Sequence, residues 1–243
     1  MRSTPSRSRL QMLVTTTLVS ASAAIAADRT ESGQTLVVPD DHAALGTVYY
    51  VHAGKDAQMT FTSDAPLEHI KGTSNQAIGY AVAPENGASV AALLKGEFRI
   101  PIESIDTGIP MRDEHLQGSR WLNAKEHPDL VFVLEGAENI DRADMDAPEG
   151  VDVWNVELTG TMSFRGMTHD FRTDARITTM KESPVTQRRA PGDLLIIRSE
   201  FPIDLRKYGL NDPGMSAGKV AETVEVDVFL LMSTVSPDEL RRR

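Results

Sequence analysis

The chain contains no cysteine, and that absence excludes several classes of protein. Without thiols there is no disulfide framework, zinc ribbon, iron–sulfur centre, cysteine nucleophile or lipid-modified amino-terminal cysteine. Basic residues are also fewer than acidic ones. The chain has 25 Lys and Arg and 35 Asp and Glu, which gives a formal net charge of -10. A nucleic-acid-binding surface needs a basic face, so the composition argues against a nucleic-acid partner.

Signatures of catalytic and cofactor sites are missing as well. None of the 6 histidines has the spacing of a helical zinc pair, and the sequence has no GxGxxG, phosphate loop or GxSxG elbow. Asp113, Glu114 and His115 fit a charged helix surface better than a metal site. The run from Ser216 to Lys219 matches the SxxK string of penicillin-interacting enzymes, but no SDN or KTG motif accompanies it. We therefore expect no metal, no cofactor and no catalytic residue.

The amino terminus has the order of a secretory signal peptide. Three arginines before residue 10 are followed by a mostly apolar stretch and then by small residues that end in Ala24-Ile25-Ala26. The apolar part is about half as long as a membrane span, and no later stretch is long enough to be one. We expect cleavage of residues 1–27 and a periplasmic or secreted mature chain without a transmembrane segment. Loss of three arginines leaves 22 basic and 35 acidic residues, a net charge of -13.

Beyond the leader, apolar and polar side chains alternate with the period of two that is typical of β-strands. The clearest case is residues 154–164, in which Trp154, Val156, Leu158, Gly160, Met162 and Phe164 fall on one face. Eight strands are predicted, at residues 59–63, 70–82, 90–102, 130–137, 154–164, 171–177, 195–203 and 220–230. Residues 48–51 are a candidate extra strand in the otherwise unpatterned segment 28–55, and residues 236–243 form a charged tail.

The predicted fold is all-β. Strands without crossover helices form antiparallel sheets, which hide their edges by closing into a barrel or by pairing as a sandwich. The length of the strands favours an extended eight-stranded barrel over residues 56–235, with a short helical insertion around 110–125. A barrel of this size can be packed solid or can hold one small ligand. Gly160 is expected to leave open space inside it.

Four motifs, in order, resemble those of the YceI family of exported, lipocalin-like isoprenoid-binding proteins. The first motif consists of SIDT at residues 104–107 and RDEHL at residues 112–116, which resemble the family's "SIDT" and "RDxHL". The second is WLNAKEHP at residues 121–128, which resembles "FFDVxKYP". The third, at residues 158–169, resembles "GxLTLHGVTK", and the fourth, RKYGL at residues 206–210, resembles "RxDFGI". Two departures are the absence of the family's opening Asp-x-x-His-Ser near Asp56 and the presence of Lys207 where an acid is usual.

The resemblance implies a non-enzymatic carrier or sequestering protein that binds a polyisoprenoid or another long-chain amphiphile inside the barrel. The residues expected to line the apolar interior are Phe98, Ile100, Ile102, Phe132, Trp154, Val156, Leu158, Met162, Phe164 and Phe201. Arg112, His115 and Arg206 are expected near the polar head group, although Arg112 equally suits a role in fixing its helix. A hydrolase or isomerase acting on a lipophilic substrate, and a packed barrel acting through its surface in envelope stress response, are the alternatives. The sequence leaves open whether the protein is a homodimer.

Overall fold

The computed structural model describes residues 35–54, 56–85 and 89–242, which form ten β-strands and several short helices. The predicted signal peptide, residues 1–27, lies outside the described residues. The strands are β1 (Thr47–Val51), β2 (Met59–Asp64), β3 (His69–Ser74), β4 (Ile78–Ala83), β5 (Lys95–Pro101), β6 (Asp129–Arg142), β7 (Val151–Phe164), β8 (Met167–Met180), β9 (Leu194–Asp204) and β10 (Thr223–Ser233). The helices are α1 (Asp40–Ala43), η1 (Ile102–Ser104), α2 (Pro110–Gln117), η2 (Thr186–Arg188), η3 (Leu205–Tyr208), α3 (Pro213–Ser216) and α4 (Pro237–Arg241). In the part of the chain that is described, no helix combines the length and apolar character needed to cross a membrane.

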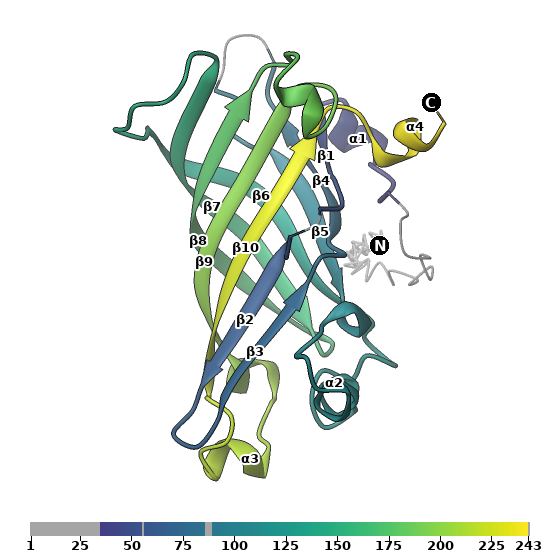
Figure 1. Cartoon of the computed structure of the whole chain (residues 1–243), viewed down its shortest axis with the longest axis vertical. Helices are drawn as coiled ribbons and strands as arrows, with labels where there is room; N and C mark the ends of the chain where they lie inside the picture. The colour runs from purple at the N-terminus through teal and green to yellow at the C-terminus, as the bar shows by residue number, and fades with distance from the viewer. Residues whose placement is uncertain (1–34, 55, 86–88, 243) are drawn as a thin grey trace, which may run out of the picture. The chain divides into compact units, whose positions relative to one another are not determined.

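Eight strands close into the antiparallel barrel that the sequence predicts (Figure 1). Their hydrogen-bonded order is β1-β4-β5-β6-β7-β8-β9-β10, and β10 pairs again with β1, where Tyr50 lies opposite Ser233. Closure pairs β1 with β4 on one side and with β10 on the other, so β1 has no free edge where these pairings run. The β2–β3 hairpin extends the sheet further along β10, where Phe61 lies opposite Val226.

Two positions in the wall are interrupted, which explains why ten strands are observed where eight were predicted. The predicted strand 70–82 is broken at residues 75–77 into β3, which pairs with β2, and β4, which pairs with β1. The candidate strand at 48–51 lies within β1, so the sheet begins ahead of residue 56, and a break at residues 52–58 separates β1 from β2.

Buried Gln58 joins the two breaks. Its Nε2 donates to the carbonyl of His52 at 3.1 Å, and its Oε1 accepts from the Ala77 N–H at 2.9 Å. Both backbone groups belong to residues outside the strands, where a buried polar group without a partner would be costly. A single side chain therefore satisfies backbone groups that the interrupted strands leave unpaired.

The alternation along β7 has the predicted orientation. Val156, Leu158, Met162 and Phe164 are each at most 9% exposed, whereas the intervening Asn155 is exposed and Thr161 is half-buried. On the outer side of the wall, the register between β6 and β7 shifts twice near Gly136 and Asn139.

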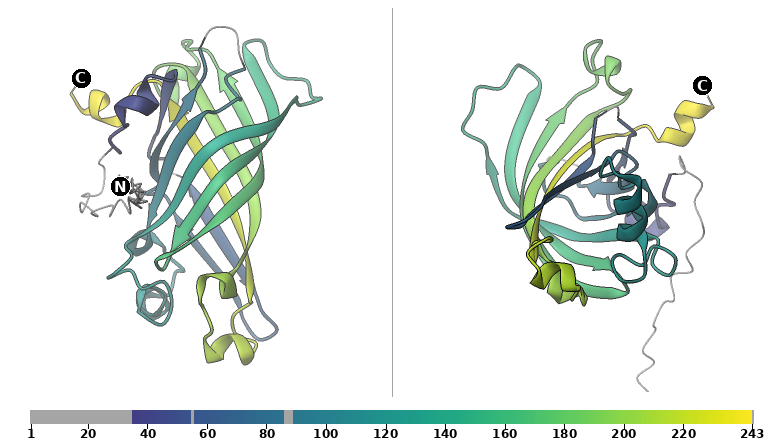
Figure 2. Two further views of the ribbon diagram at one scale, coloured as in Figure 1. Left: turned by 180° about the vertical axis from the view of Figure 1, so that it is seen from behind. Right: turned by 60° about the horizontal axis from the view of Figure 1, so that its bottom comes forward.

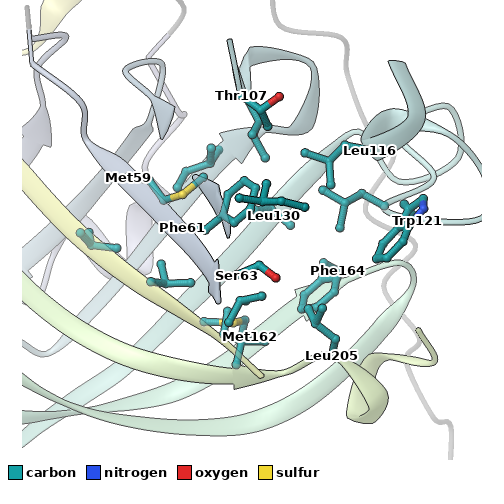
Figure 3. A pocket seen from close by; sticks show the side chains of 18 of the residues that line it. Met59, Phe61, Ser63, Thr107, Leu116, Trp121, Leu130, Met162, Phe164 and Leu205 are labelled. Atoms are coloured by element: carbon teal, nitrogen blue, oxygen red, sulfur yellow. The ribbon is translucent and has the colours of Figure 1, made fainter. Parts of the chain in front are cut away.

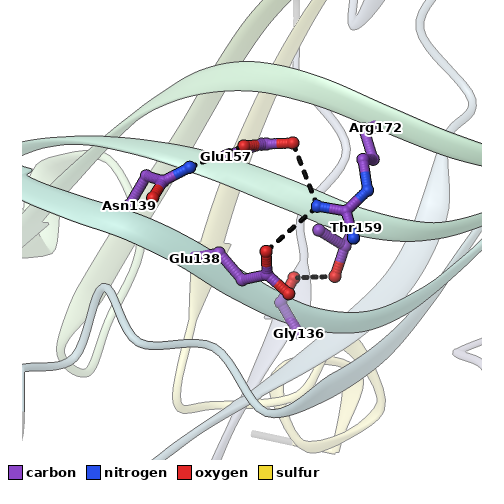
Figure 4. Close-up of polar contacts among 6 residues, drawn as sticks. All are labelled: Gly136, Glu138, Asn139, Glu157, Thr159 and Arg172. Carbon is purple, nitrogen blue, oxygen red and sulfur yellow. Dashed lines mark hydrogen bonds and ion pairs between the residues drawn. The ribbon is translucent and has the colours of Figure 1, made fainter.

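Polar side chains connect the strands at these register shifts (Figure 4). Arg172 of β8 donates to Glu138 at 3.0 Å and to Glu157 at 3.1 Å, and Asn139 donates to Glu157 at 2.7 Å. Asn139 has a φ of 49°, a left-handed conformation that asparagine tolerates better than most residues. These contacts hold β6, β7 and β8 together where their regular pairing is disturbed.

The barrel interior has two parts, which we call the packed end and the hollow end. Ala81, Leu93, Leu134, Ile177, Leu195 and Met232, each at most 1% exposed, belong to the core of the packed end. The core of the hollow end includes Met59, Met162, Phe164, Leu210 and Val226. The helical α2 insertion and the loop with α3 lie at the rim of the hollow end (Figures 1 and 2).

The packed end corrects one strand boundary. The predicted strand 90–102 begins only at Lys95, and residues 90–94 form a turn in which Ala91 and Leu93 are buried in the core. The Leu93 carbonyl accepts from the Ala137 N–H at 3.0 Å, which holds this turn against β6. The apolar residues at 90–94 therefore reflect a buried turn and not a strand face.

The wall parts between β8 and β9 on the side of the hollow end. Their pairing runs from Met180–Leu194 to Ala175–Ser199 and stops there, although β8 remains paired with β7 and β9 with β10. We call the facing stretches, residues 167–174 and 200–204, the seam. Ser199 Oγ donates to the Asp174 carbonyl at 2.7 Å where the pairing ends. Beyond that point, Phe171 and Phe201 meet edge to face with ring centroids 4.8 Å apart, so this ring contact bridges the seam.

The helical insertion is held by its own motif residues. Asp113 of α2 accepts from both the N–H (2.9 Å) and the hydroxyl (2.6 Å) of Thr107, and Asp106 forms a bridge with Thr73 of β3. Helix α2 ends at Gln117, where Gly118 is the C-cap, so Trp121 and the residues that follow it lie in turns. The "SIDT" and "RDxHL" runs thus fasten the insertion to the barrel.

Candidate functional site

The hollow end contains a cavity of about 530 Å³. Its wall combines inward side chains of the strands with side chains of the α2 insertion and of the loop that follows β9. Figure 3 shows Phe61 and Leu130 on one side, Met162, Phe164 and Leu205 on another, and Leu116 and Trp121 from the insertion, all around a common space. Nearly every group on the wall is apolar, so the cavity suits a ligand with a large apolar part.

Four aromatic rings contact one another in a row along the cavity wall. Phe98 stacks near Phe132 at 6.3 Å, Phe132 meets Phe171 at 5.8 Å, and Phe171 meets Phe201 at 4.8 Å. All four rings line the cavity. Edge-to-face and offset ring pairs are favourable beyond the apolar area they bury, so the row forms an ordered apolar surface.

Four hydroxyl side chains line the cavity, those of Ser63, Thr107, Thr173 and Ser199. Thr173 Oγ1 and Ser199 Oγ are 2.8 Å apart, and Ser199 also donates to the Asp174 carbonyl. Ser63 Oγ accepts from the Ala221 N–H at 2.9 Å, whereas the Thr107 hydroxyl donates to the Asp113 carboxylate at 2.6 Å. The Thr173–Ser199 pair therefore has no base among its hydrogen-bond partners in the described residues that could activate either oxygen as a nucleophile.

Charged groups gather where the wall reaches the rim. Glu68 in the β2–β3 turn, Arg112 and His115 of α2, and Lys219 after α3 all line the cavity. Among the described residues, neither Arg112 nor Lys219 forms an ion pair within 4.0 Å. The rim therefore offers two cations and one imidazole beside a single carboxylate.

Phe164 marks the transition from wall to rim. Its ring stacks on that of Tyr208 in η3 at 3.8 Å, and burial raises the pKa of the Tyr208 hydroxyl. The ring of His169 also contacts the Tyr208 ring, edge to face, with centroids 4.9 Å apart. This aromatic cluster joins β7, β8 and η3 and fixes the loop that begins with η3.

The structure brings most of the expected interior residues together. Phe98, Ile100, Phe132, Leu158, Met162, Phe164 and Phe201 all line the cavity. Ile102, Trp154 and Val156 do not. Ile102 is fully buried in η1, Val156 belongs to the core of the packed end, and Trp154 packs against that core with the Arg142 guanidinium 5.8 Å from its ring.

The expected head-group set needs one correction. Arg112 and His115 line the cavity, but Arg206 does not; its exposed guanidinium pairs with Glu222. Lys219 takes the third basic position on the wall. No family motif and no periodic pattern marks Lys219, which lies in a Gly/Pro loop.

Gly160 also differs from expectation. A Cβ at this position would lie 2.0 Å from the carbonyl oxygen of Val133, and Gly160 does not line the cavity. The glycine is needed for close approach of β7 to β6, so it does not mark open space for a ligand.

Comparison with known proteins agrees with the fold. Residues 49–231 match the family described as YceI-like domain. Similar solved structures include BcnA from Burkholderia cenocepacia (16% identity, 75% of this chain and 99% of that chain, TM-score 0.53) and the Campylobacter jejuni YCEI protein (18% identity, 82% and 97%, TM-score 0.51). A third is a polyisoprenoid binding domain from Saccharophagus degradans (13% identity, 77% and 98%, TM-score 0.52).

Comparison with curated proteins gave no match. At these identities the solved structures show a shared fold, whereas the family match covers most of the sequence. The resemblance found in the four motifs is thereby confirmed, and the chain belongs to the YceI-like domain family.

Proposed function

We propose that this protein is an exported carrier or sequestering protein that holds a polyisoprenoid or a similar amphiphilic lipid in the cavity of the hollow end. The observation that carries the proposal is the distribution of polarity: the cavity wall is apolar, and its charged residues lie at the rim. An amphiphile has the same distribution, with a long apolar part and one polar head. The polyisoprenoid binding domain from Saccharophagus degradans, which shares the fold, supports the same ligand class.

The size and chemistry of the cavity support this ligand. A volume of about 530 Å³ falls within the range of about 300–1,000 Å³ that is usual for pockets holding one small molecule. Burial of an apolar chain gains about 25 cal/mol per Å² of surface removed from water. Because this gain is not directional, the wall selects for apolar character and shape, and selectivity for a particular lipid rests on the rim.

The rim favours an anionic head group. The planar guanidinium of Arg112 can bind two oxygens of a phosphate or carboxylate, and the Lys219 ammonium adds a point charge. His115 adds a ring nitrogen that can donate or accept a hydrogen bond. Glu68 on the same wall offsets part of this positive charge.

We favour a role without catalysis because of how the hydroxyl groups of the wall are engaged. Hydrolysis or isomerisation of a bound lipid needs an activated nucleophile or a general base against the substrate. Thr173 and Ser199 are engaged with each other and with the Asp174 carbonyl, and the Thr107–Asp113 contact holds the start of α2. His115 and Glu68 also line the cavity, but among the described residues neither side chain hydrogen-bonds to a hydroxyl of the wall.

Export is proposed from the amino-terminal sequence. The basic start, the short apolar stretch and Ala24-Ile25-Ala26 suit cleavage before Ala27 and release into the periplasm or the medium. Amino-terminal sequencing of the protein recovered from its source should begin at or near Ala27. A predominant species that begins with Met1 contradicts this part of the proposal.

Native mass spectrometry of protein purified under mild conditions tests the ligand. The folded chain is expected to carry the mass of one lipid, and the variant with Arg112→Gln and Lys219→Gln is expected to carry less of it. A chain that stays unliganded after incubation with polyisoprenyl phosphate and with polyisoprenols contradicts the proposal and favours the alternative of a barrel that acts through its surface.

A further inference from the structure

We propose that the rim of the cavity mouth docks on the surface of a lipid bilayer. The docking surface consists of Leu67, Ile109 and Met111 together with Arg112 and Lys219. This inference rests on the proposed function, because a lipid carrier must take up or deliver its ligand at a membrane.

Large apolar side chains are exposed around the mouth. Leu67 is 69% exposed, Ile109 is 45% exposed and Met111 is 68% exposed. Ile109 and Met111 also line the cavity, so one apolar surface continues from the interior to the outside. A lipid that moves between the cavity and a bilayer in contact with this surface keeps its apolar chain away from water along that path.

The elements that carry these side chains are fixed to one another. The Leu67 N–H donates to the Gly218 carbonyl at 2.9 Å, which ties the β2–β3 turn to the loop that carries Lys219. Thr107 and Asp113 hold the start of α2, where Met111 lies. Both elements lie at the lower end of the barrel in Figure 1. The docking surface is therefore formed before any membrane is present.

The charges at the mouth are mixed. Arg112 and Lys219 have no acidic partner within 4.0 Å among the described residues. Asp113 and Glu114 lie on the same helix as Arg112, and Glu68 lies in the β2–β3 turn. Because these charges offset one another, the exposed apolar side chains provide the attraction to the bilayer.

A matched pair of variants tests the docking surface. Leu67→Asp changes an exposed residue that does not line the cavity, and Val185→Asp makes the same change at the opposite end, where Val185 is 73% exposed. Co-sedimentation is measured with vesicles of phosphatidylcholine containing phosphatidylglycerol and with vesicles of phosphatidylcholine alone. All proteins share the wild-type amino terminus, so its contribution cancels when affinities are compared.

The wild-type protein is expected to bind the phosphatidylcholine vesicles, and added phosphatidylglycerol is not expected to strengthen that binding, because the chain has a net charge of -10. Leu67→Asp should reduce the affinity for the phosphatidylcholine vesicles about tenfold, which corresponds to about 1.4 kcal/mol, whereas Val185→Asp should change it less than about twofold. Wild-type protein that does not bind the phosphatidylcholine vesicles, or two variants that lose binding equally, overturns the docking proposal.

A measurement without vesicles separates this proposal from the proposed function. Uptake of a pyrene-labelled fatty acid in solution should be equal for the wild type and Leu67→Asp. Failure of uptake by the wild type counts against the lipid-binding function, whereas loss of uptake only in Leu67→Asp overturns the assignment of Leu67 to docking.

Discussion

The packed end and the hollow end are built from the same strands, yet one is solid and the other holds a cavity. Strand β7 shows this directly, because Val156 belongs to the packed core while Met162 and Phe164 line the cavity. The packed end is filled by a turn that buries Ala91 and Leu93. The hollow end has the α2 insertion at its rim instead. The difference shows that the same strands can enclose a filled core at one end and a cavity at the other, with the turn at residues 90–94 and the α2 insertion contributing at opposite ends.

The largest effect is expected from a charge placed in the wall. Phe164→Asp would bury a carboxylate beside the Tyr208 ring without a basic partner, and it should lower the free energy of unfolding by about 3–5 kcal/mol. Thr161→Lys is the control, because Thr161 faces outward opposite Asp170, and it should change stability by less than about 0.5 kcal/mol. Urea denaturation measures both. A stable Phe164→Asp protein with an unstable Thr161→Lys protein would reverse the inward and outward faces of β7.

Truncation of one apolar side chain at each end sharpens the comparison. Ile177 is fully buried in the packed core, and Ile177→Ala should cost about 2–5 kcal/mol because it creates a new cavity. Leu130 lines the existing cavity and is only partly buried, so Leu130→Ala should cost about 1 kcal/mol. Equal costs in chemical denaturation would mean that the hollow end is packed as tightly as the other.

Enlargement of a side chain should also affect the stability of the packed end more than that of the hollow end. Ala81→Phe at the packed end forces a ring into a filled core and should destabilise the lipid-free protein by about 1–3 kcal/mol. Val228→Phe points into the cavity and should change the melting temperature little while it reduces lipid uptake. Thermal melting and uptake of a labelled fatty acid are measured on the same samples. Normal uptake by Val228→Phe would place the lipid elsewhere.

The smallest effect is expected on the pH dependence of stability, through His52 between β1 and β2. Burial lowers the pKa of His52 from its usual 6.5, although the hydrogen bond from its Nε2 to the Val235 carbonyl at 2.8 Å acts in the opposite direction. The unfolded chain therefore takes up a proton on this residue at a higher pH than the folded chain, so its contribution to stability is present above about pH 6.5 and is lost as the pH falls below that value. Stability measured from pH 7.5 to 5 should decrease less steeply for His52→Gln. Parallel pH profiles would show that His52 does not titrate differently in the two states.

The sequence predicts the wall of the barrel better than its ends. Alternation of apolar side chains is a local property of a strand, and it places Leu158, Met162 and Phe164 on the inner face without knowledge of any partner. The turn at residues 90–94 has the same apolar spacing as a strand, and only its contact with Ala137 of β6 shows that it is a buried turn. The role of Gln58 is equally hidden, because its two partners lie in separate breaks of the wall.

The rim is the part least visible in the sequence. Arg206 lies in a recognised motif but pairs with Glu222 outside the cavity, whereas Lys219 lines the cavity because the loop that carries it is tied to the β2–β3 turn. Contacts between loops distant in the chain decide which cation faces the ligand, and no periodic pattern records them.

The seam between β8 and β9 is a line along which the backbone offers little resistance to widening. In a fully paired barrel, a change of girth requires backbone hydrogen bonds to break. Below Ala175 and Ser199, the two strands are joined by the hydroxyls of Thr173 and Ser199 and by the Phe171–Phe201 ring contact. Widening along this line would therefore strain side-chain contacts, while the β7–β8 and β9–β10 ladders stay paired.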